Sequence, residues 1–107
     1  MPVTLKSKKG VLTAFIKGEI DHHTAPAIRE TIDDTFLSLE NTELLVLDFG
    51  DVTFMDSSGV GLVMGRYRIA SANGKKIRVD NLSDRDYKIM KMSGIEKLAE
   101  VRRKEVK

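Results

Sequence analysis

The sequence predicts an α/β fold, with a mixed sheet of four to five strands and three to four helices in the order β-β-α-β-α-β-α. One observation is that extended apolar segments alternate with segments in which apolar residues recur at helical spacing. Another is that residues 44–47 are continuously apolar, which is typical of a central strand buried on both faces. Helical crossovers imply parallel strands, and the length of 107 residues fits one domain, 1–107.

The first third of the chain predicts a hairpin and a helix. Residues 3–7 and 11–16 are the strands, joined by a turn at Lys8-Lys9-Gly10, and residues 18–21 then leave the sheet. Thr24 stands at the cap position of the helix, with a proline two residues later in the first turn. One face of this helix is apolar and contains Ile28, Ile32, Phe36 and Leu39.

The middle of the chain predicts the central strand and a second helix. Phe49 ends the strand, Gly50-Asp51 turns the chain, and residues 52–55 form an extended link. The helix covers residues 58–72 and stops at Asn73-Gly74. One side of this helix carries Val60, Val63, Tyr67 and Ala70.

The last third predicts a short strand over residues 77–79 and a third helix. Ser83 is the cap of this helix and Gly94 its end. A short helical turn over residues 95–98 and an edge strand over 99–103 follow.

Composition excludes several classes of protein. The chain has no cysteine, so disulfides and thiolate metal sites are excluded, in agreement with a cytoplasmic protein. No apolar run approaches the ~20 residues that span a bilayer, and the N-terminus lacks the apolar core of a signal peptide. No membrane partner is therefore expected. Because 18 basic and 16 acidic residues nearly balance, we also expect no direct nucleic-acid binding.

The segment Phe54–Gly61 places two hydroxyls and an acid between the central strand and the second helix. Ser57 or Ser58 can be a helix cap, which contributes about 1 kcal/mol to stability. Either can also accept a phosphate, which adds about −1.5 to −2 charges and disrupts a docked partner while the fold survives. Residues 18–21 and 55–58 both follow strands, so we expect them to lie together at one edge of the sheet.

Enzymatic interpretations of this segment fit poorly. A nucleophile elbow needs Gly-x-Ser-x-Gly, and Met55 stands where the first glycine belongs. The spacing of Gly59, Gly61 and Gly65 is one residue too long for a dinucleotide fingerprint, so no cofactor is expected. These glycines instead let the helix approach the sheet or a partner closely.

Metal ligation is not expected either. His22 and His23 are adjacent, so their rings should point apart, and no third ligand completes a set. For Asp48, Asp51 and Asp56, turn and cap roles are favoured over a magnesium site. Most methionines are expected in the core, whereas Met55 is expected to be exposed to a partner.

Two stretches resemble the signature stretches of a known family. Gly18-Glu19-Ile20-Asp21-His22-His23-Thr24-Ala25 and Phe54-Met55-Asp56-Ser57-Ser58-Gly59-Val60-Gly61 are similar to those of bacterial anti-sigma factor antagonists, which are single STAS domains. The similarity continues through residues 65–67 and 92–95 and covers nearly the whole chain. The histidine pair most resembles the sporulation antagonists of the anti-sigma F factor, and general-stress antagonists are nearly as similar.

The resemblance implies a STAS-like sheet and a protein that is a ligand and substrate, not an enzyme. Family members bind an anti-sigma factor that is also a serine kinase, and so release the sigma factor. The kinase then phosphorylates the antagonist with ATP, and a PP2C-type phosphatase restores it. The family's acceptor position is Ser57 here. The implied partner-binding residues are Glu19, Asp21, Met55, Asp56, Ser57, Ser58, Gly59 and Val60.

One departure from the family pattern concerns the C-terminus. The family usually ends in a longer helix, which we expect to be short or missing after Val101. Two rival interpretations remain: a STAS interaction module of another signalling or transport-associated complex, and a small enzyme that uses the aspartates or serines.

Overall fold

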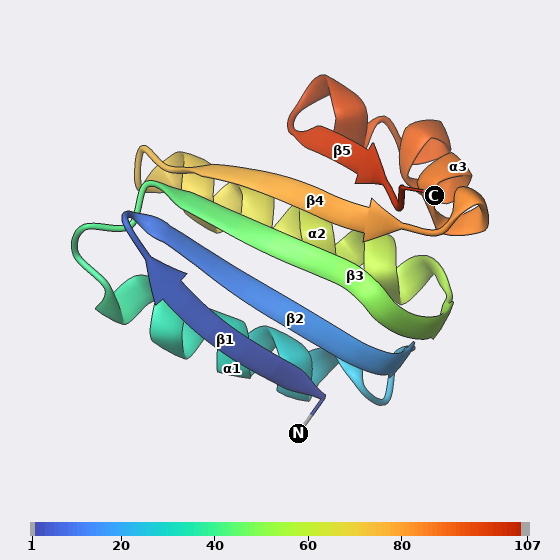
Figure 1. The fold of residues 1–107 in the computed structure, drawn as a ribbon, viewed down its shortest axis with the longest axis horizontal. Coiled ribbons are helices and arrows are strands. Elements are labelled where there is room, and N and C mark those ends of the chain that lie inside the picture. Colours follow the sequence, from blue (N-terminus) through green and yellow to red (C-terminus); the bar gives the residue numbers. More distant parts are fainter. Residues whose placement is uncertain (1, 106–107) are drawn as a thin grey trace.

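One mixed five-stranded sheet lies at the centre of the computed structural model, which describes residues 2–105. The strands lie side by side in chain order (Figure 1): β1 (Val3–Lys8), β2 (Val11–Ile20), β3 (Leu44–Met55), β4 (Lys76–Leu82) and β5 (Glu100–Arg103). β1 is antiparallel to β2, and every other neighbouring pair is parallel. The predicted α/β fold is confirmed, and β5 is the edge strand predicted over residues 99–103.

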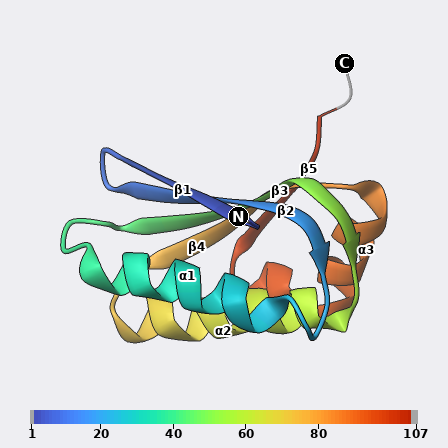
Figure 2. The ribbon, with the colours of Figure 1, turned by 90° about the horizontal axis from the view of Figure 1, so that it is seen from below.

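Within residues 2–105 the helical elements are α1 (Ala25–Ser38), α2 (Ser57–Ala72), α3 (Asp84–Ser93) and the 3-10 turn η1 (Ile95–Lys97). Helices α1 and α2 cover the same face of the sheet, and no helix of the described residues lies over the opposite face (Figure 2). The parallel strands β2, β3 and β4 are added in one direction across the sheet, so right-handed crossovers place both helices on one side.

The hydrophobic core lies between this face of the sheet and the helices. The apolar stripe predicted for α1 is confirmed for Ile28, Ile32 and Phe36, which are fully buried. Leu39 is half-buried and lies just after the helix, because α1 ends at Ser38. The central position of β3 is also confirmed. Val46 points to the face without helices yet is only 2% exposed, because side chains of the neighbouring strands cover it.

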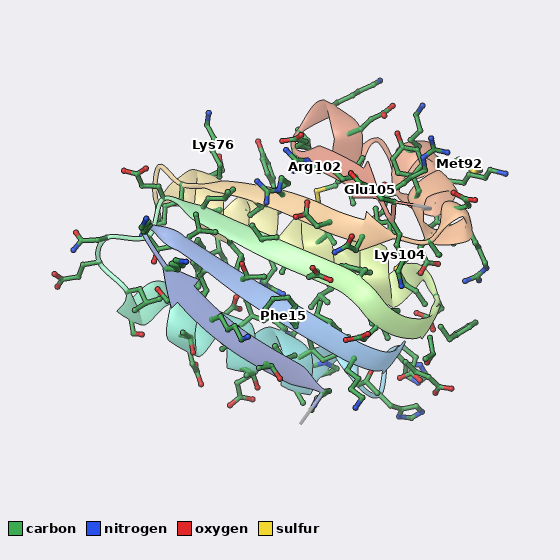
Figure 3. The ribbon with its side chains drawn as sticks, viewed as in Figure 1. Phe15, Lys76, Met92, Arg102, Lys104 and Glu105 are labelled. Carbon is green, nitrogen blue, oxygen red and sulfur yellow. The ribbon has the colours of Figure 1, made fainter. Side chains whose placement is uncertain are left out.

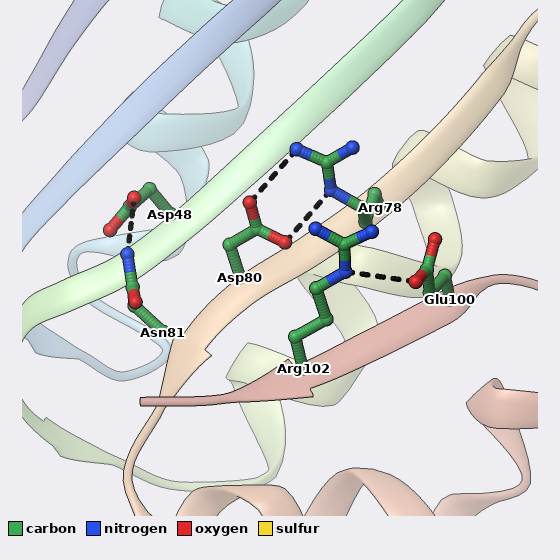
Figure 4. Close-up of polar contacts among 6 residues, drawn as sticks. All are labelled: Asp48, Arg78, Asp80, Asn81, Glu100 and Arg102. Atoms are coloured by element: carbon green, nitrogen blue, oxygen red, sulfur yellow. Dashed lines mark hydrogen bonds and ion pairs between the residues drawn. The ribbon is translucent and has the colours of Figure 1, made fainter. Parts of the chain in front are cut away.

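The face without helices is largely polar. In the close-up of Figure 4, Arg78 donates to both carboxylate oxygens of Asp80 at 2.9 and 3.0 Å. Asn81 donates to Asp48 at 2.8 Å, which gives Asp48 a structural role. Near the middle of this face is Phe15 (Figure 3), whose ring lies 5.7 Å from the Lys6 ammonium. These polar side chains have hydrogen-bond or ion-pair partners, so this face of the sheet can be exposed to water without a covering helix.

Three strands are clearly longer than the sequence predicts. β4 covers Lys76–Leu82 rather than residues 77–79, because its pairing with β3 and β5 extends it at both ends. Residues 18–20 do not leave the sheet, because β2 continues to Ile20. Gly50-Asp51 does not turn the chain, because β3 continues through it to Met55. Phe15 pairs with Asp48 and Ile20 with Met55, so β3 takes seven residue steps where β2 takes five. Two β-bulges accommodate the extra residues, one between Asp48 and Asp51, which includes Gly50, and one between Val52 and Phe54.

The third helix has the predicted termini. The Ser83 hydroxyl accepts a hydrogen bond from the Asp86 amide at 3.1 Å, and Gly94 ends the helix with a φ of +86°. After β5, residues 104 and 105 are not helical, and the last two residues lie outside the described part. Among residues 2–105, no helix combines the length and apolar character needed to cross a bilayer.

Candidate functional site

The carboxyl ends of β2 and β3 form one edge of the sheet. Ile20 pairs with Met55, and the Asp56 amide donates to the Ile20 carbonyl at 3.1 Å. Residues 18–21 and 55–58 therefore lie together, as the sequence predicts. We call residues 54–58 the serine loop and residues 19–24 the acidic turn.

Asp56 is the N-cap of helix α2. Its backbone is extended, and its carboxylate accepts a 2.7 Å hydrogen bond from the Ser58 amide. The interpretation of a serine as the cap is wrong, and α2 begins at Ser57 rather than Ser58. A carboxylate at this position satisfies a free amide and interacts favourably with the positive end of the helix dipole. Capping is thus assigned to the acid, and the Ser57 hydroxyl is left without a capping role.

Ser57 is exposed, whereas Ser58 and Val60 are half-buried. A hydroxyl at the first position of a surface helix is accessible to the active site of a second protein. The geometry meets the first requirement for a phosphoacceptor, because Ser57 is the more accessible of the two serines.

Met55 and Gly59 are buried beneath the loop. The side chain of Met55 is 0% exposed, so its predicted exposure to a partner is wrong. A β-carbon built on Gly59 would overlap Cγ and Sδ of Met55. The prediction that a glycine lets α2 approach the sheet closely is therefore confirmed for Gly59. Both residues support the serine loop from below.

Phe54 is an exposed apolar side chain that the sequence analysis did not identify. It is 44% exposed, and the guanidinium carbon of Arg85 lies 5.3 Å from its ring centroid. Arg85 also donates to the Met55 carbonyl at 3.3 Å. Strand alternation places neighbouring side chains on opposite faces, so either Phe54 or Met55 had to face outward. This alternation was not applied to residues 54 and 55 because the strand was predicted to end at Phe49.

The acidic turn is closed by two side chains. The Asp21 carboxylate accepts from the amides of His23 and Thr24, both at 2.9 Å. The Thr24 hydroxyl donates to the Glu19 carbonyl at 2.9 Å. Thr24 occupies the N-cap position of α1 as predicted, but its side chain makes no cap hydrogen bond to the helix. The hydrogen bond from the Thr24 amide is the main reason that the pKa of Asp21 lies below its ordinary value. Burial opposes this shift, and the amide and charge of His23 and the Thr24 hydroxyl add to it.

The histidine pair does not diverge as predicted. The rings of His22 and His23 have centroids 4.0 Å apart, because both residues lie in a turn rather than in a regular element. Both are exposed. Among residues 2–105, no group of three or more His, Cys, Asp or Glu side chains has the arrangement to hold a metal ion.

A cleft of about 430 Å³ lies beside Ser58, between the N-terminal halves of α1 and α2. Arg29, Arg66 and Arg68 contribute to its wall. Arg66 is buried, and its Nε lies 2.8 Å from Oδ1 of Asp33 on α1. Burial raises the pKa of Asp33, and the Arg66 charge opposes that shift. This ion pair ties the two helices together below the site.

The comparisons with known proteins agree with this geometry. A family model described as the STAS domain matches residues 2–107. The anti-sigma F factor antagonist of Paenibacillus polymyxa is 30% identical over 99% of this chain and 90% of its own length. The anti-sigma-B factor antagonist of Bacillus subtilis is 28% identical over 92% of this chain and 88% of its own length.

Solved structures of the anti-sigma factor antagonist SpoIIAA are similar as well. Its unphosphorylated form matches with a TM-score of 0.77 and 29% identity, covering 92% of this chain and 86% of the other. The phosphorylated form, described as a Bacillus cell fate determinant, matches with a TM-score of 0.72 and 29% identity, covering 92% and 89%. SpoIIAA is thus a protein of this fold that exists with and without phosphate.

Proposed function

The chain belongs to the STAS-domain family, and from this membership we propose that it is an anti-sigma factor antagonist. In this proposal residues 1–107 form a single STAS domain that binds an anti-sigma factor with serine kinase activity and thereby releases a sigma factor. Phosphorylation of Ser57 ends that binding, and a PP2C-type phosphatase reverses it. The protein acts in the cytoplasm as ligand and substrate, not as an enzyme, and needs no cofactor, nucleic acid or membrane.

The observation that carries the proposal is the exposed Ser57 directly after a capping aspartate, at the edge where β2 and β3 end. Because Asp56 supplies the cap, modification of Ser57 removes no structural hydrogen bond of the helix N-terminus. The fold is therefore expected to tolerate the phosphate. Support also comes from the relatives named as anti-sigma factor antagonists and from SpoIIAA, which has a phosphorylated form.

The partner surface proposed for this chain has two layers. The side chains that reach the surface are Glu19, Asp21, Asp56, Ser57, Ser58 and Val60. Met55 and Gly59 lie beneath them and act by holding the serine loop in place. Exposed Phe54 adds an apolar side chain next to the acceptor.

The switch follows from electrostatics. In the phosphoryl transfer a bond forms between the Ser57 oxygen and the γ-phosphorus of ATP, ADP leaves, and the hydroxyl proton passes to a base of the kinase. An unmodified hydroxyl fits within a desolvated contact, whereas an unpaired buried charge costs several kcal/mol. Since every 1.4 kcal/mol changes affinity tenfold, one phosphate weakens binding by orders of magnitude.

Incubation with the cognate kinase and ATP tests the proposal. Intact-mass spectrometry should find one added phosphate on the protein and none on Ser57→Ala. Ser58→Ala is the matched control and should still gain one phosphate. Phosphate that persists in Ser57→Ala would reject Ser57 as the acceptor.

A further inference from the structure

The guanidinium of Arg85 is held beside the serine loop by contacts that it can exchange. Its Nη1 lies 3.3 Å from the Met55 carbonyl oxygen and 3.2 Å from Oδ1 of Asp86. Its carbon lies 5.3 Å from the centroid of the Phe54 ring. The Arg85 side chain is 59% exposed. A guanidinium has five N–H donors, so Arg85 retains donors for a further acceptor.

Arg85 also lies within reach of Ser57. The carbonyl that it binds belongs to a residue only two positions before Ser57, and consecutive Cα atoms are 3.8 Å apart. The Cα atoms of Met55 and Ser57 are therefore separated by at most about 7.6 Å. Rotation of two flexible side chains covers such a span, so no backbone movement is required.

We propose that Arg85 is the intramolecular receptor of the phosphate on Ser57. The inference rests on the proposed function, because it concerns the phosphorylated form. On modification the guanidinium leaves the Phe54 ring and the Met55 carbonyl and binds two phosphate oxygens. Such forked, charge-assisted pairs are stronger than neutral hydrogen bonds.

The other cations near the site are placed less well. Arg29, Arg66 and Arg68 line the cleft that Ser58 borders. Arg66 is buried against Asp33, and Arg29 on α1 makes no hydrogen bond or ion pair with residues 54–58. Arg68 is eleven residues along α2 from Ser57, or about 16 Å along the helix axis. Arg103 lies 3.8 Å from Asp84 and against the Tyr87 ring. Arg85 is thus the arginine that the contacts place at the loop itself.

The acidic groups around the serine loop add to the negative charge that Arg85 must offset. Asp56 from α2 and Asp86 from α3 both repel a phosphate, as do Glu19 and Asp21 of the acidic turn. Without a cation these charges would raise the second pKa of the phosphate above about 6. A bound guanidinium has the opposite effect.

Phosphorylation therefore alters the partner surface at two points. It adds charge at Ser57, and it removes the arginine that covers Phe54. A partner that docks on the unmodified protein loses both the neutral hydroxyl and the arranged Phe54–Arg85 pair. Arg85 also neutralises part of the new charge, so the modified protein stays folded.

The test uses phosphoserine installed at position 57 during translation, so it needs no kinase and is independent of the assay for the proposed function. A ³¹P NMR titration measures the second pKa of the phosphate in the otherwise unchanged protein, in Arg85→Gln and in Arg68→Gln. Arg85→Gln should raise the pKa by about half a unit or more, and Arg68→Gln should leave it unchanged. No shift in Arg85→Gln, or a larger shift in Arg68→Gln, would overturn the proposal.

A second measurement separates direct contact from long-range electrostatics. In the unmodified protein the Phe54 ring current should shift the side-chain proton signals of Arg85, and phosphoserine at position 57 should abolish this shift. Retention of the shift would contradict the exchange of partners. Amide fingerprint spectra verify that each variant is folded. Arg85→Lys keeps the positive charge but loses the two-pronged guanidinium, so it should give an intermediate phosphate pKa.

Discussion

The side chain of Met55 occupies the space in which a β-carbon of residue 59 would lie. Met55 is the last residue of β3, and Gly59 is the third residue of α2. Both are buried, so the end of the strand and the start of the helix are locked together. Ser57, the first residue of α2, lies between these two residues in the chain and is held at a fixed place on the surface.

Gly59→Ala is expected to lower the free energy of unfolding by about 1–3 kcal/mol, because the new methyl overpacks against Met55. Urea unfolding followed by circular dichroism measures the change. The matched control is Gly61→Ala, where a β-carbon meets nothing within 4 Å. That variant should gain up to about 1 kcal/mol from helix propensity. Equal effects at the two positions would show that the contact with Met55 is unimportant.

Asp56→Ala is expected to cost about 1 kcal/mol of stability, because the Ser58 amide loses its acceptor. Asp56→Asn should remain close to the parent protein, since asparagine caps a helix about as well. Thermal unfolding compares them with Ser57→Ala. If Ser57→Ala lost as much as Asp56→Ala, the serine would share the capping role that the structure assigns to the acid.

The ion pair between Asp33 and Arg66 predicts a strongly non-additive double-mutant cycle. Arg66→Met leaves the carboxylate partly buried without its cation, and Asp33→Leu leaves a buried cation unpaired. Each single change should cost about 2–3 kcal/mol, somewhat less than for a fully buried pair because Asp33 is 20% exposed. The double variant should be more stable than either single variant. Additive losses in urea unfolding would contradict a direct interaction.

Two aspartates are expected to titrate in opposite directions. The amides of the acidic turn lower the pKa of Asp21 in the folded state. The ionised Asp21 therefore stabilises the fold above its unfolded pKa of about 3.9, and this stabilisation is lost as the pH falls through the lower folded pKa. Burial raises the pKa of Asp33 in the folded state. The contribution of Asp33 to stability therefore falls as the pH rises from about 3.9 through the higher folded pKa.

Carboxyl ¹³C NMR measures both titrations in one sample. Asp21→Asn and Asp33→Asn should each remove the corresponding signal and the corresponding slope of stability against pH. An Asp21 pKa at or above that of Asp33 would contradict the hydrogen bonds described for the acidic turn.

Much of the fold follows from local patterns in the sequence. The apolar stripe of α1 and the cap and stop of α3 depend on residues close together in the chain, and the structure has them as predicted. The meeting of residues 18–21 with 55–58 was also predictable, because the carboxyl ends of parallel strands share an edge.

The ends of β2 and β3 were not predictable in the same way. Gly50-Asp51 is a turn signal in isolation, but pairing with β2 keeps it in the strand and accommodates the two extra residues as bulges. The two one-residue bulges together leave the alternation beyond them unchanged, so Met55 faces the core as Phe49 does, and Phe54 faces outward. Applying this alternation requires that β3 continue to Met55, which depends on its pairing with β2.

The sequence does not show which residue caps helix α2. An acid and two serines in succession offer three possible caps, and only the structure shows that Asp56 takes the role. Arg85 lies far along the chain from the serine loop and reaches it through α3, so no local motif connects the two.

The affinity of the anti-sigma factor kinase for this protein, measured by calorimetry with Ser57 unmodified and phosphorylated, tests the central claim most directly. We expect the unmodified form to bind at least a hundredfold more tightly, which corresponds to about 2.8 kcal/mol, while both forms give the amide spectrum of the same fold. Equal affinities for the two folded forms would contradict it.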